Sequence, residues 1–209
     1  MVSRLRRFIA SRWLPLLAAG VGFATFGLIG LWVHNGPLHW DSVVWRKLDG
    51  YENSRTADAA LRISHLFAGT YPVVAWILII VAVLVAFRQI RAAFFVCAAT
   101  AVILLVPILK DAFQRPPPTT SAERYSFPSG HAISSVAIVA AVVVLLWPTR
   151  WRWAALVLGS AYALVVGAAV VLDRGHWPSD VVAGWGLAAA WVAVCTLVIR
   201  PRPLGARDG

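Results

Sequence analysis

The chain has 209 residues, of which 60% are hydrophobic and 13% are charged, and its mean hydropathy is +0.74. This composition excludes a soluble globular protein of this size and predicts an all-α, polytopic integral membrane protein. The formal net charge of +10 would suit a nucleic-acid partner, but the arrangement of the arginines described below leaves no basic face for one.

Six apolar stretches are each about long enough, at roughly 20 residues per crossing, to form a transmembrane helix. They cover residues 14–33, 71–87, 92–109, 131–148, 153–172 and 181–199, and the second and third are short. The first is too long for the apolar region of a signal peptide, so we expect an uncleaved span. With no internal repeat, residues 1–209 are predicted to form one membrane domain, with a site-bearing core at about 71–199.

The charges predict the orientation of the six spans. If the spans alternate, the inner segments carry eleven arginines and one acid, Asp208, so the inner face sums to +10 and the outer face to zero. Because positive loops stay in the cytoplasm, both termini are expected there. The ratio of 17 arginines to two lysines is typical of a GC-rich bacterial genome, which predicts residence in a bacterial plasma membrane.

The outer segment from His34 to Gly69 is long for a loop and contains Trp40 and Trp45. Its stretch from Ala57 to Phe67 has helical apolar spacing. Either this stretch lies along the outer surface and forms one wall of a lipid entrance, or the segment is a folded loop without a ligand role.

The third span and the loop after it carry several basic residues. Pro107 should kink or end the span near its outer end. Lys110 follows at the interface, where it is either a snorkelling lysine or part of a site. The proline-rich loop from Asp111 to Phe127 contains Arg115 and Arg124, and its prolines should hold it extended.

The fourth span opens with the sequence Ser-Phe-Pro-Ser-Gly-His-Ala-Ile-Ser-Ser, from Ser126 to Ser135. Ser129, Gly130 and His131 therefore stand where a helix begins. Free backbone N–H groups and the positive end of the helix dipole make that point suitable for an anion.

A second cluster, from His176 to Asp180, opens the sixth span. If the helix starts at or before His176, the spacing of four residues places His176 and Asp180 on one face. The carboxylate would then accept a hydrogen bond from one ring nitrogen and leave the other as nucleophile or base. Cys97 and Cys195 lie inside predicted spans and are expected to be packing residues rather than a disulfide.

The predicted topology brings basic and imidazole side chains from three segments to the outer side. These are Lys110, Arg115, Arg124, His131, Arg174 and His176, with Asp180 beside them. Guanidinium groups and a lysine suit a phosphate, and two histidines can supply a nucleophile and a proton donor for phosphoryl transfer. Because no Walker loop, kinase motif or magnesium-type carboxylate cluster is present, the reaction is expected to need no metal and no cofactor.

Three motifs resemble the signatures of the type 2 phosphatidic acid phosphatase superfamily, the lipid phosphate phosphatases. They are Lys110, the Pro-Ser-Gly-His sequence ending at His131, and the His-Trp-Pro-Ser-Asp sequence from His176 to Asp180. The resemblance implies that His176 attacks phosphorus and becomes phosphohistidine, that Asp180 orients it, and that His131 protonates the leaving group. It further implies that Lys110, Ser129 and Gly130 hold phosphate oxygens.

Two arginines of the family pattern are missing from their expected places. The first signature, lysine, six residues, arginine and proline, places Pro117 where arginine is expected, with Arg115 two residues early. The third signature places Val170 at its arginine, and the nearest arginine is Arg174. A shift of two extended residues moves a Cα by roughly 7 Å, which a long side chain can largely recover. Arg115 and Arg174, with Arg124 as a further candidate, are therefore the expected phosphate-binding arginines.

Several functions fit this pattern. The first is metal-independent removal of phosphate from a lipid monophosphate or diphosphate at the outer face, with polyprenyl carriers, phosphatidic acid and phosphatidylglycerophosphate as candidate substrates and the bilayer as environment. The second is a non-catalytic lipid binder or transporter that kept the fold. A vanadium-dependent haloperoxidase is a third, although those proteins are soluble, and a bundle with incidental interfacial histidines is the fourth. The sequence leaves the oligomeric state open.

Overall fold

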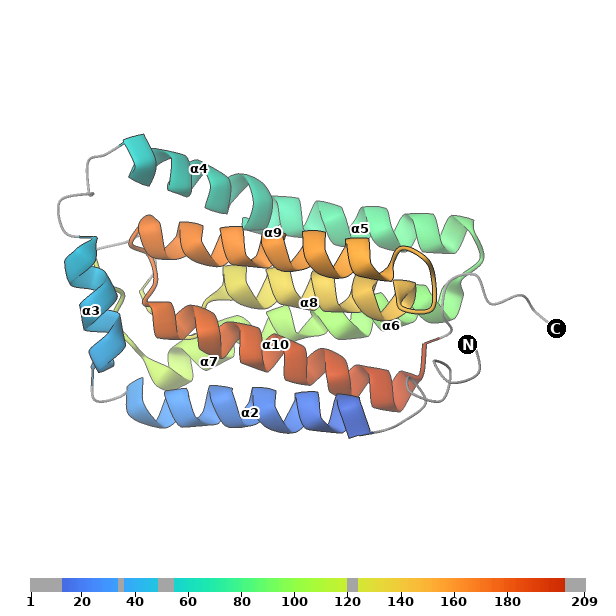
Figure 1. The fold of residues 1–209 in the computed structure, drawn as a ribbon, viewed down its shortest axis with the longest axis horizontal. Helices are drawn as coiled ribbons and strands as arrows, with labels where there is room; N and C mark the ends of the chain where they lie inside the picture. Colours follow the sequence, from blue (N-terminus) through green and yellow to red (C-terminus); the bar gives the residue numbers. More distant parts are fainter. Residues whose placement is uncertain (1–12, 34–35, 49–54, 120–123, 202–209) are drawn as a thin grey trace.

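The computed structural model describes residues 13–33, 36–48, 55–119 and 124–201, without the side chains of residues 56 and 57. All regular elements in these ranges are helical, which confirms the all-α expectation for this part of the chain (Figure 1). The elements are α2 (Trp13–Val33), α3 (His39–Lys47), α4 (Arg55–Ala68), α5 (Thr70–Ala86), α6 (Ile90–Thr100), η1 (Ala101–Leu105), α7 (Val106–Phe113), α8 (Gly130–Leu146), α9 (Arg152–Leu172) and α10 (Pro178–Ile199).

Within the described residues, five helical stretches are long and apolar enough to cross a membrane. They are Trp13–Val33, Asp58–Ala86, Ile90–Phe113, Arg152–Leu172 and Pro178–Ile199. The remaining predicted span, α8, is an apolar helix of 17 residues, shorter than the other five. The protein is therefore an integral membrane protein. The two chain termini, and the arginines before residue 13 and after residue 201, lie outside the described residues.

Helix α10 lies at the centre of the bundle because its small residues let its neighbours approach closely. A Cβ on Gly22 of α2 would lie only 2.4 Å from the Gly186 carbonyl oxygen, so these two helices meet backbone to backbone. On its other side, α10 packs on α8 and α6. Helix α8 buries one stripe at four-residue spacing, formed by Ile133, Ala137, Ala141 and Leu145.

The stretch from Ala57 to Phe67 does not lie along the outer surface, so this expectation was wrong. It belongs to α4, which leads through Gly69 directly into α5 and packs beside α9 (Figure 1). Together α4 and α5 form one long apolar stretch, Asp58–Ala86. The face of α4 that is buried consists of small residues, Ala60, Ser64 and Ala68, whereas Leu61, Leu66 and Phe67 are exposed.

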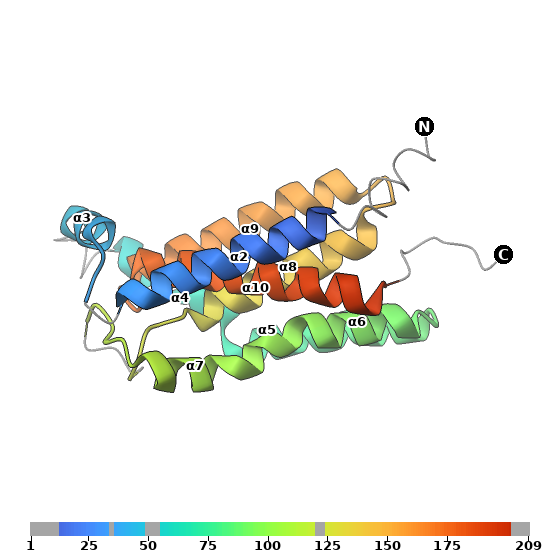
Figure 2. The same ribbon diagram turned by 90° about the horizontal axis from the view of Figure 1, so that it is seen from below.

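Pro107 interrupts the third span as expected. The α-helix stops at Thr100, continues as the 3₁₀ segment η1, and resumes as α7 with the proline in its first turn. A proline has no N–H group and its ring clashes with the carbonyl four residues earlier, so the tighter 3₁₀ turn precedes it. Figure 2 shows α6 and α7 following one another along one side of the bundle.

One end of the bundle is built differently from the other. The short helix α3 lies across the end where α2 and α9 stop and where α10 begins (Figure 1). The turns between α5 and α6 and between α8 and α9 lie at the opposite end. All the predicted site residues that the structure describes belong to the end that α3 covers.

Candidate active site

The two histidines singled out from the sequence lie next to one another. His131 is the second residue of α8, and His176 lies in the short connection between α9 and α10. Their ring centroids are 6.2 Å apart, and the ring planes meet at 69°. The His176 side chain is buried, whereas His131 is partly exposed. One phosphoryl group can therefore contact both rings, as the sequence-based hypothesis requires.

His176 is oriented mainly by a backbone carbonyl. Its Nδ1 lies 2.9 Å from the Ser126 carbonyl oxygen and 3.7 Å from Asp180 Oδ2. Because a carbonyl oxygen only accepts hydrogen bonds, Nδ1 carries the proton and donates it, and the neutral ring has its lone pair on Nε2. That tautomer makes Nε2 the nucleophilic atom. The expected hydrogen bond to Asp180 is thus a longer contact, and the Ser126 carbonyl is the closer partner.

The four-residue relation between His176 and Asp180 does not come from a shared helix. Helix α10 begins at Pro178, after the histidine, so the condition stated from the sequence is not met. A capping turn brings the two residues together instead. Asp180 Oδ2 accepts a 2.9 Å hydrogen bond from the Trp177 backbone N–H, which fixes the carboxylate at the start of the helix.

Arg115 lies in a buried cluster of charged groups. Its Nη1 donates to Asp180 Oδ1 and, at 2.7 Å, to Ser179 Oγ. Its Nη2 donates to Asp41 Oδ2 at 2.8 Å. Both aspartates have fully buried side chains. The two terminal nitrogens of the guanidinium group, which was expected to bind phosphate, are therefore engaged by protein carboxylates.

Arg174 is turned toward α3. Its Nη2 donates to the Leu48 carbonyl oxygen at 3.0 Å, and its guanidinium carbon lies 4.2 Å from the centre of the Trp45 ring. The residue has a positive φ of 62°, which a non-glycine residue adopts only at an energetic cost. Trp45 also contacts Trp177, with ring centroids 5.4 Å apart. Arg174 therefore anchors the end of α3 to the connection that carries His176.

The start of α8 provides an anion site next to His131. Ser129 caps the helix by accepting a hydrogen bond from the Ala132 N–H at 3.4 Å, and its own N–H donates to the Asp180 carbonyl at 3.2 Å. This bond joins the beginnings of α8 and α10. The N–H groups of the first turn and the helix dipole favour a negatively charged ligand.

Gly130 permits α7 to approach the beginning of α8. A Cβ at this position would lie 3.3 Å from Val106 Cγ1, closer than most side-chain contacts. Lys110 follows Val106 by four residues and so shares a face of α7 with it. The start of α7 therefore lies beside Gly130 at the start of α8, and Lys110 lies about one helical turn further along α7.

Arg124 differs from the other predicted site residues because it is exposed. Its guanidinium carbon lies 5.0 Å from the centre of the neighbouring Tyr125 ring, and no contact with the cluster around His176 is seen. In the described part of the chain, no group of three or more His, Cys, Asp or Glu side chains is arranged to hold a metal ion.

Sequence reasoning missed two residues of the buried cluster. Ser179 stands beside Asp180 within a motif that was quoted, yet only its contacts with Arg115 and Asp41 reveal its importance. Asp41 belongs to no motif. The one available signal was its spacing of four residues from Trp45, which places both on one face of a short helix.

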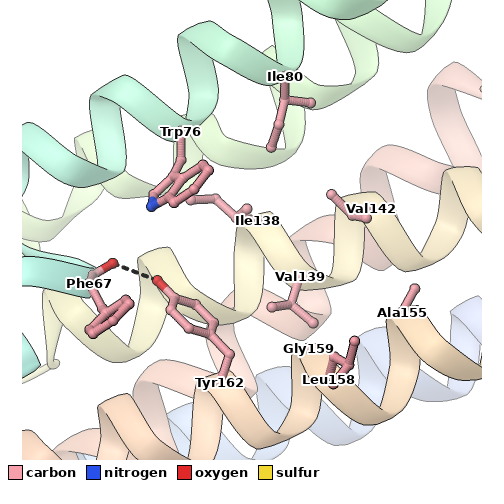
Figure 3. Close-up of a pocket in the computed structure, with 10 residues that line it drawn as sticks. All are labelled: Phe67, Trp76, Ile80, Ile138, Val139, Val142, Ala155, Leu158, Gly159 and Tyr162. Carbon is pink, nitrogen blue, oxygen red and sulfur yellow. Dashed lines mark hydrogen bonds between the residues drawn. The ribbon is translucent and has the colours of Figure 1, made fainter.

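An apolar groove of about 400 Å³ lies between α5, α8 and α9, below the end of α4 (Figure 3). It is lined by Phe67, Trp76, Ile80, Ile138, Val139, Val142, Ala155, Leu158, Gly159 and Tyr162. At one end Tyr162 donates a hydrogen bond of 2.7 Å to the Phe67 carbonyl, shown dashed in Figure 3. On α8, Ile138 and Val142 follow His131 by 7 and 11 residues, so all three lie on one face of that helix.

Comparison with known proteins finds two similar chains. The chain is 38% identical over 76 residues to an undecaprenyl-diphosphatase from Sulfolobus acidocaldarius, a match covering 36% of this chain and 34% of that protein. This chain therefore aligns with about a third of that relative's length. The fold resembles the crystal structure of a transmembrane PAP2 type phosphatidylglycerolphosphate phosphatase from Bacillus subtilis, with a TM-score of 0.60 and 18% identity over 90% of this chain and 94% of that one.

The family comparison supplies the identification. The match to the PAP2 superfamily covers residues 90–203, more than half of the chain, and includes α6 to α10 with both histidines. The resemblance inferred from the three motifs is therefore confirmed, and the chain belongs to the PAP2 superfamily.

Proposed function

We propose that the protein removes phosphate from a lipid monophosphate or diphosphate without a metal ion, through a phosphohistidine on His176. The observation that carries this proposal is the pair of imidazole rings 6.2 Å apart, with His176 Nδ1 held by the Ser126 carbonyl. A lipid binder or a transporter needs neither a fixed tautomer nor a second imidazole beside it.

The proposed reaction has two steps. In the first, the Nε2 lone pair of His176 attacks phosphorus, the bond to the bridging oxygen breaks, and His131 gives that oxygen a proton. In the second, His131 takes a proton from water, whose oxygen attacks the phosphohistidine, and inorganic phosphate leaves with the His176 lone pair restored. Lys110, the Ser129 hydroxyl and the Gly130 N–H at the start of α8 stabilise the charge on the phosphate oxygens.

The apolar groove supports a substrate with a hydrocarbon chain. Ile138 and Val142 lie roughly 10 and 16 Å along α8 from His131, at 1.5 Å per residue, and on its side of the helix. A lipid whose phosphate lies at His131 can therefore extend its chain into the groove, which excludes water from the chain. The named activities of the two similar proteins, on undecaprenyl diphosphate and phosphatidylglycerolphosphate, favour polyprenyl or diacyl lipids, and phosphatidic acid shares their chemistry.

We also propose six crossings, with α8 as the fourth, and a site on the extracytoplasmic side of a bacterial plasma membrane. The support is the distribution of charge between the two ends of the bundle. Arg88, Arg91, Arg150, Arg152 and Arg200 all lie in turns or at helix ends away from α3. Positive residues favour the cytoplasmic side, which places the end covered by α3 outside.

The test is phosphate release from a panel of lipid phosphates by the detergent-solubilised protein, with a chelator present. We expect turnover that vanadate inhibits, and a rate lower by at least roughly 10⁴-fold in His176→Ala, because the nucleophile is lost. His39→Ala, which removes an exposed histidine of α3, is the matched control and should keep full activity. Full activity of His176→Ala would overturn the nucleophile assignment.

The groove has its own test. Val142→Trp fills it, so KM should rise for a long-chain lipid phosphate and stay unchanged for a short-chain, water-soluble one. Val157→Trp adds the same bulk on α9 at a position that is 64% exposed and outside the groove, and should change neither value. An equal change for both substrates in Val142→Trp would rule out a chain-binding role.

One observation favours a second function, a lipid-phosphate binder or transporter without catalysis. The guanidinium groups of Arg115 and Arg174 contact protein groups, and these were the arginines expected to hold phosphate. Specific lipid binding with no phosphate release from any member of the panel would establish this alternative.

A further inference from the structure

Asp41 is a fully buried carboxylate in α3, outside the residues 90–203 that match the PAP2 superfamily. Its Oδ1 accepts the Ser179 backbone N–H at 2.9 Å, and its Oδ2 accepts the Ser179 hydroxyl at 2.6 Å and Arg115 Nη2 at 2.8 Å. A fourth bond, 3.0 Å from the Leu38 N–H to Oδ2, caps the helix to which Asp41 itself belongs. Both carboxylate oxygens are therefore fully used.

Asp41 and Asp180 occupy equivalent positions in their helices. Each aspartate accepts the backbone N–H of the residue three positions earlier, Leu38 for α3 and Trp177 for α10. Each carboxylate thus stabilises a helix N-terminus. Arg115 lies between the two and donates one terminal nitrogen to each. The guanidinium group therefore connects the N-termini of α3 and α10 through the buried side chains of Asp41, Arg115 and Asp180.

This chain of contacts determines how Asp180 meets His176. Arg115 and the Trp177 N–H hold different oxygens of the Asp180 carboxylate, Oδ1 and Oδ2, so its rotation is fixed. The oxygen turned toward His176 Nδ1 is Oδ2, at 3.7 Å. A buried charge without its partner is costly, so removing the charge of Asp41 would leave Arg115 free to shift toward Asp180.

We propose that Asp41 is a positioning residue for phosphoryl transfer, acting through Arg115 and Ser179 on the Asp180 carboxylate that lies beside His176; this rests on the proposed function. Asp41 then connects α3 to the catalytic site, although α3 touches neither histidine in the described contacts. The same geometry makes Arg115 a positioning residue, with its main role toward the two carboxylates.

The first test compares Asp41→Asn with Asp58→Asn, which removes an exposed acid on α4. Asparagine keeps the size of the side chain, but its NH₂ group would face the N–H and O–H donors that contact the Asp41 carboxylate. We expect kcat per folded molecule to fall on the order of 10-fold to 10²-fold, since small displacements of reacting groups have such effects. KM should stay within about twofold, because no phosphate contact is removed. The control should match the wild type.

A double-mutant comparison separates positioning from general loss of structure. If Asp41 acts through Asp180, the Asp41→Asn/Asp180→Asn protein should be no slower than Asp180→Asn alone. If the double mutant lost activity by the product of the two single-mutant factors, the two residues would act independently and the proposal would be overturned. Arg115→Lys should behave like Asp41→Asn and lower kcat, whereas a direct phosphate contact by Arg115 would appear as a raised KM and weaker inhibition by vanadate.

A measurement without turnover keeps this proposal distinct from the proposed function. In protein labelled with ¹⁵N-histidine, the His176 resonances, assigned with His176→Gln, should report the tautomer protonated at Nδ1 and should shift in Asp41→Asn but not in Asp58→Asn. Unchanged resonances together with unchanged kcat would overturn the positioning role. If the wild type released no phosphate while the resonances shifted, the proposed function would fail and the coupling between Asp41 and His176 would stand.

Discussion

The two ends of the bundle differ in their arginines, because among the described residues only the end covered by α3 contains buried ones. At the end away from α3, Arg88, Arg91 and Arg150 are exposed, and Arg150 and Arg152 lie over the rings of the neighbouring Trp151 and Trp153. At the other end Arg115 and Arg174 are buried, with 2% and 5% of their surface exposed. An exposed charge contributes through its sign, whereas a buried charge must be matched atom by atom. The arginines of the first end therefore act through the sign of their charge, whereas Arg115 and Arg174 act through specific contacts.

After the loss of His176, the largest effect should come from His131, at the end covered by α3. His131→Ala should lower the rate on a lipid phosphate by roughly 10² to 10⁴-fold, because the leaving oxygen loses its proton donor. An aryl phosphate whose leaving group is acidic needs no such donor and should be hydrolysed at a rate much closer to that of the wild type. Steady-state rates on both substrates measure the difference, and equal losses would contradict the general-acid role.

The next effect concerns stability. Arg115→Met leaves Asp41 and Asp180 buried without their shared cation, and breaking such a buried pair costs about 3–5 kcal/mol in the free energy of unfolding. Arg150→Met makes the same substitution at the exposed end and should cost less than about 0.5 kcal/mol. Unfolding in mixed detergents, followed by tryptophan fluorescence, gives both values. Similar values for the two variants would remove the distinction between the ends.

A smaller effect is expected at the start of α8. Ser129→Ala removes the side chain that accepts the Ala132 N–H, and loss of such a cap costs about 1 kcal/mol. Ser134→Ala removes a buried hydroxyl one turn later, which bonds the His131 carbonyl at 3.1 Å and caps nothing, so its cost should be lower. The same unfolding measurement applies, and a larger loss for Ser134→Ala would show that capping is not the main role of Ser129.

The smallest effect is expected from Arg152, at the end away from α3. Arg152→Gln should leave kcat and KM unchanged and alter the free energy of unfolding by less than about 0.5 kcal/mol. Its influence should appear in topology, since removing Arg150 and Arg152 together weakens the positive bias of one turn. Labelling of single cysteines from either side of the membrane measures that bias. A fall in kcat for Arg152→Gln would show that this end also serves catalysis.

Much of the fold follows from local sequence properties. Apolar runs of sufficient length predict membrane helices, and their order predicted that His131 and His176 meet. The same reasoning failed for the stretch from Ala57 to Phe67, because helical apolar spacing specifies a buried face but does not say what buries it. In the structure α4 packs beside α9 with its small residues Ala60, Ser64 and Ala68 buried, while Leu61 and Leu66 are exposed.

The details of the site depend on contacts between distant segments. Asp41 and Ser179 are 138 residues apart, and no local pattern relates them. Arg115 was expected to bind phosphate because of its place in a motif, yet its terminal nitrogens contact Asp41, Ser179 and Asp180. A side chain of this length can reach several partners, so its choice is decided by the surrounding burial and charge.

In the proposed arrangement of six crossings, the short length of α8 relates the enzyme to the thickness of its membrane. A helix of 17 residues rises about 25 Å, which is less than a hydrocarbon layer of roughly 30 Å. Such a mismatch is relieved by local thinning of the bilayer, at a modest cost for each ångström. Since His131 stands at the tip of this helix, a thinner host bilayer should lower the work of bringing a phosphate to it.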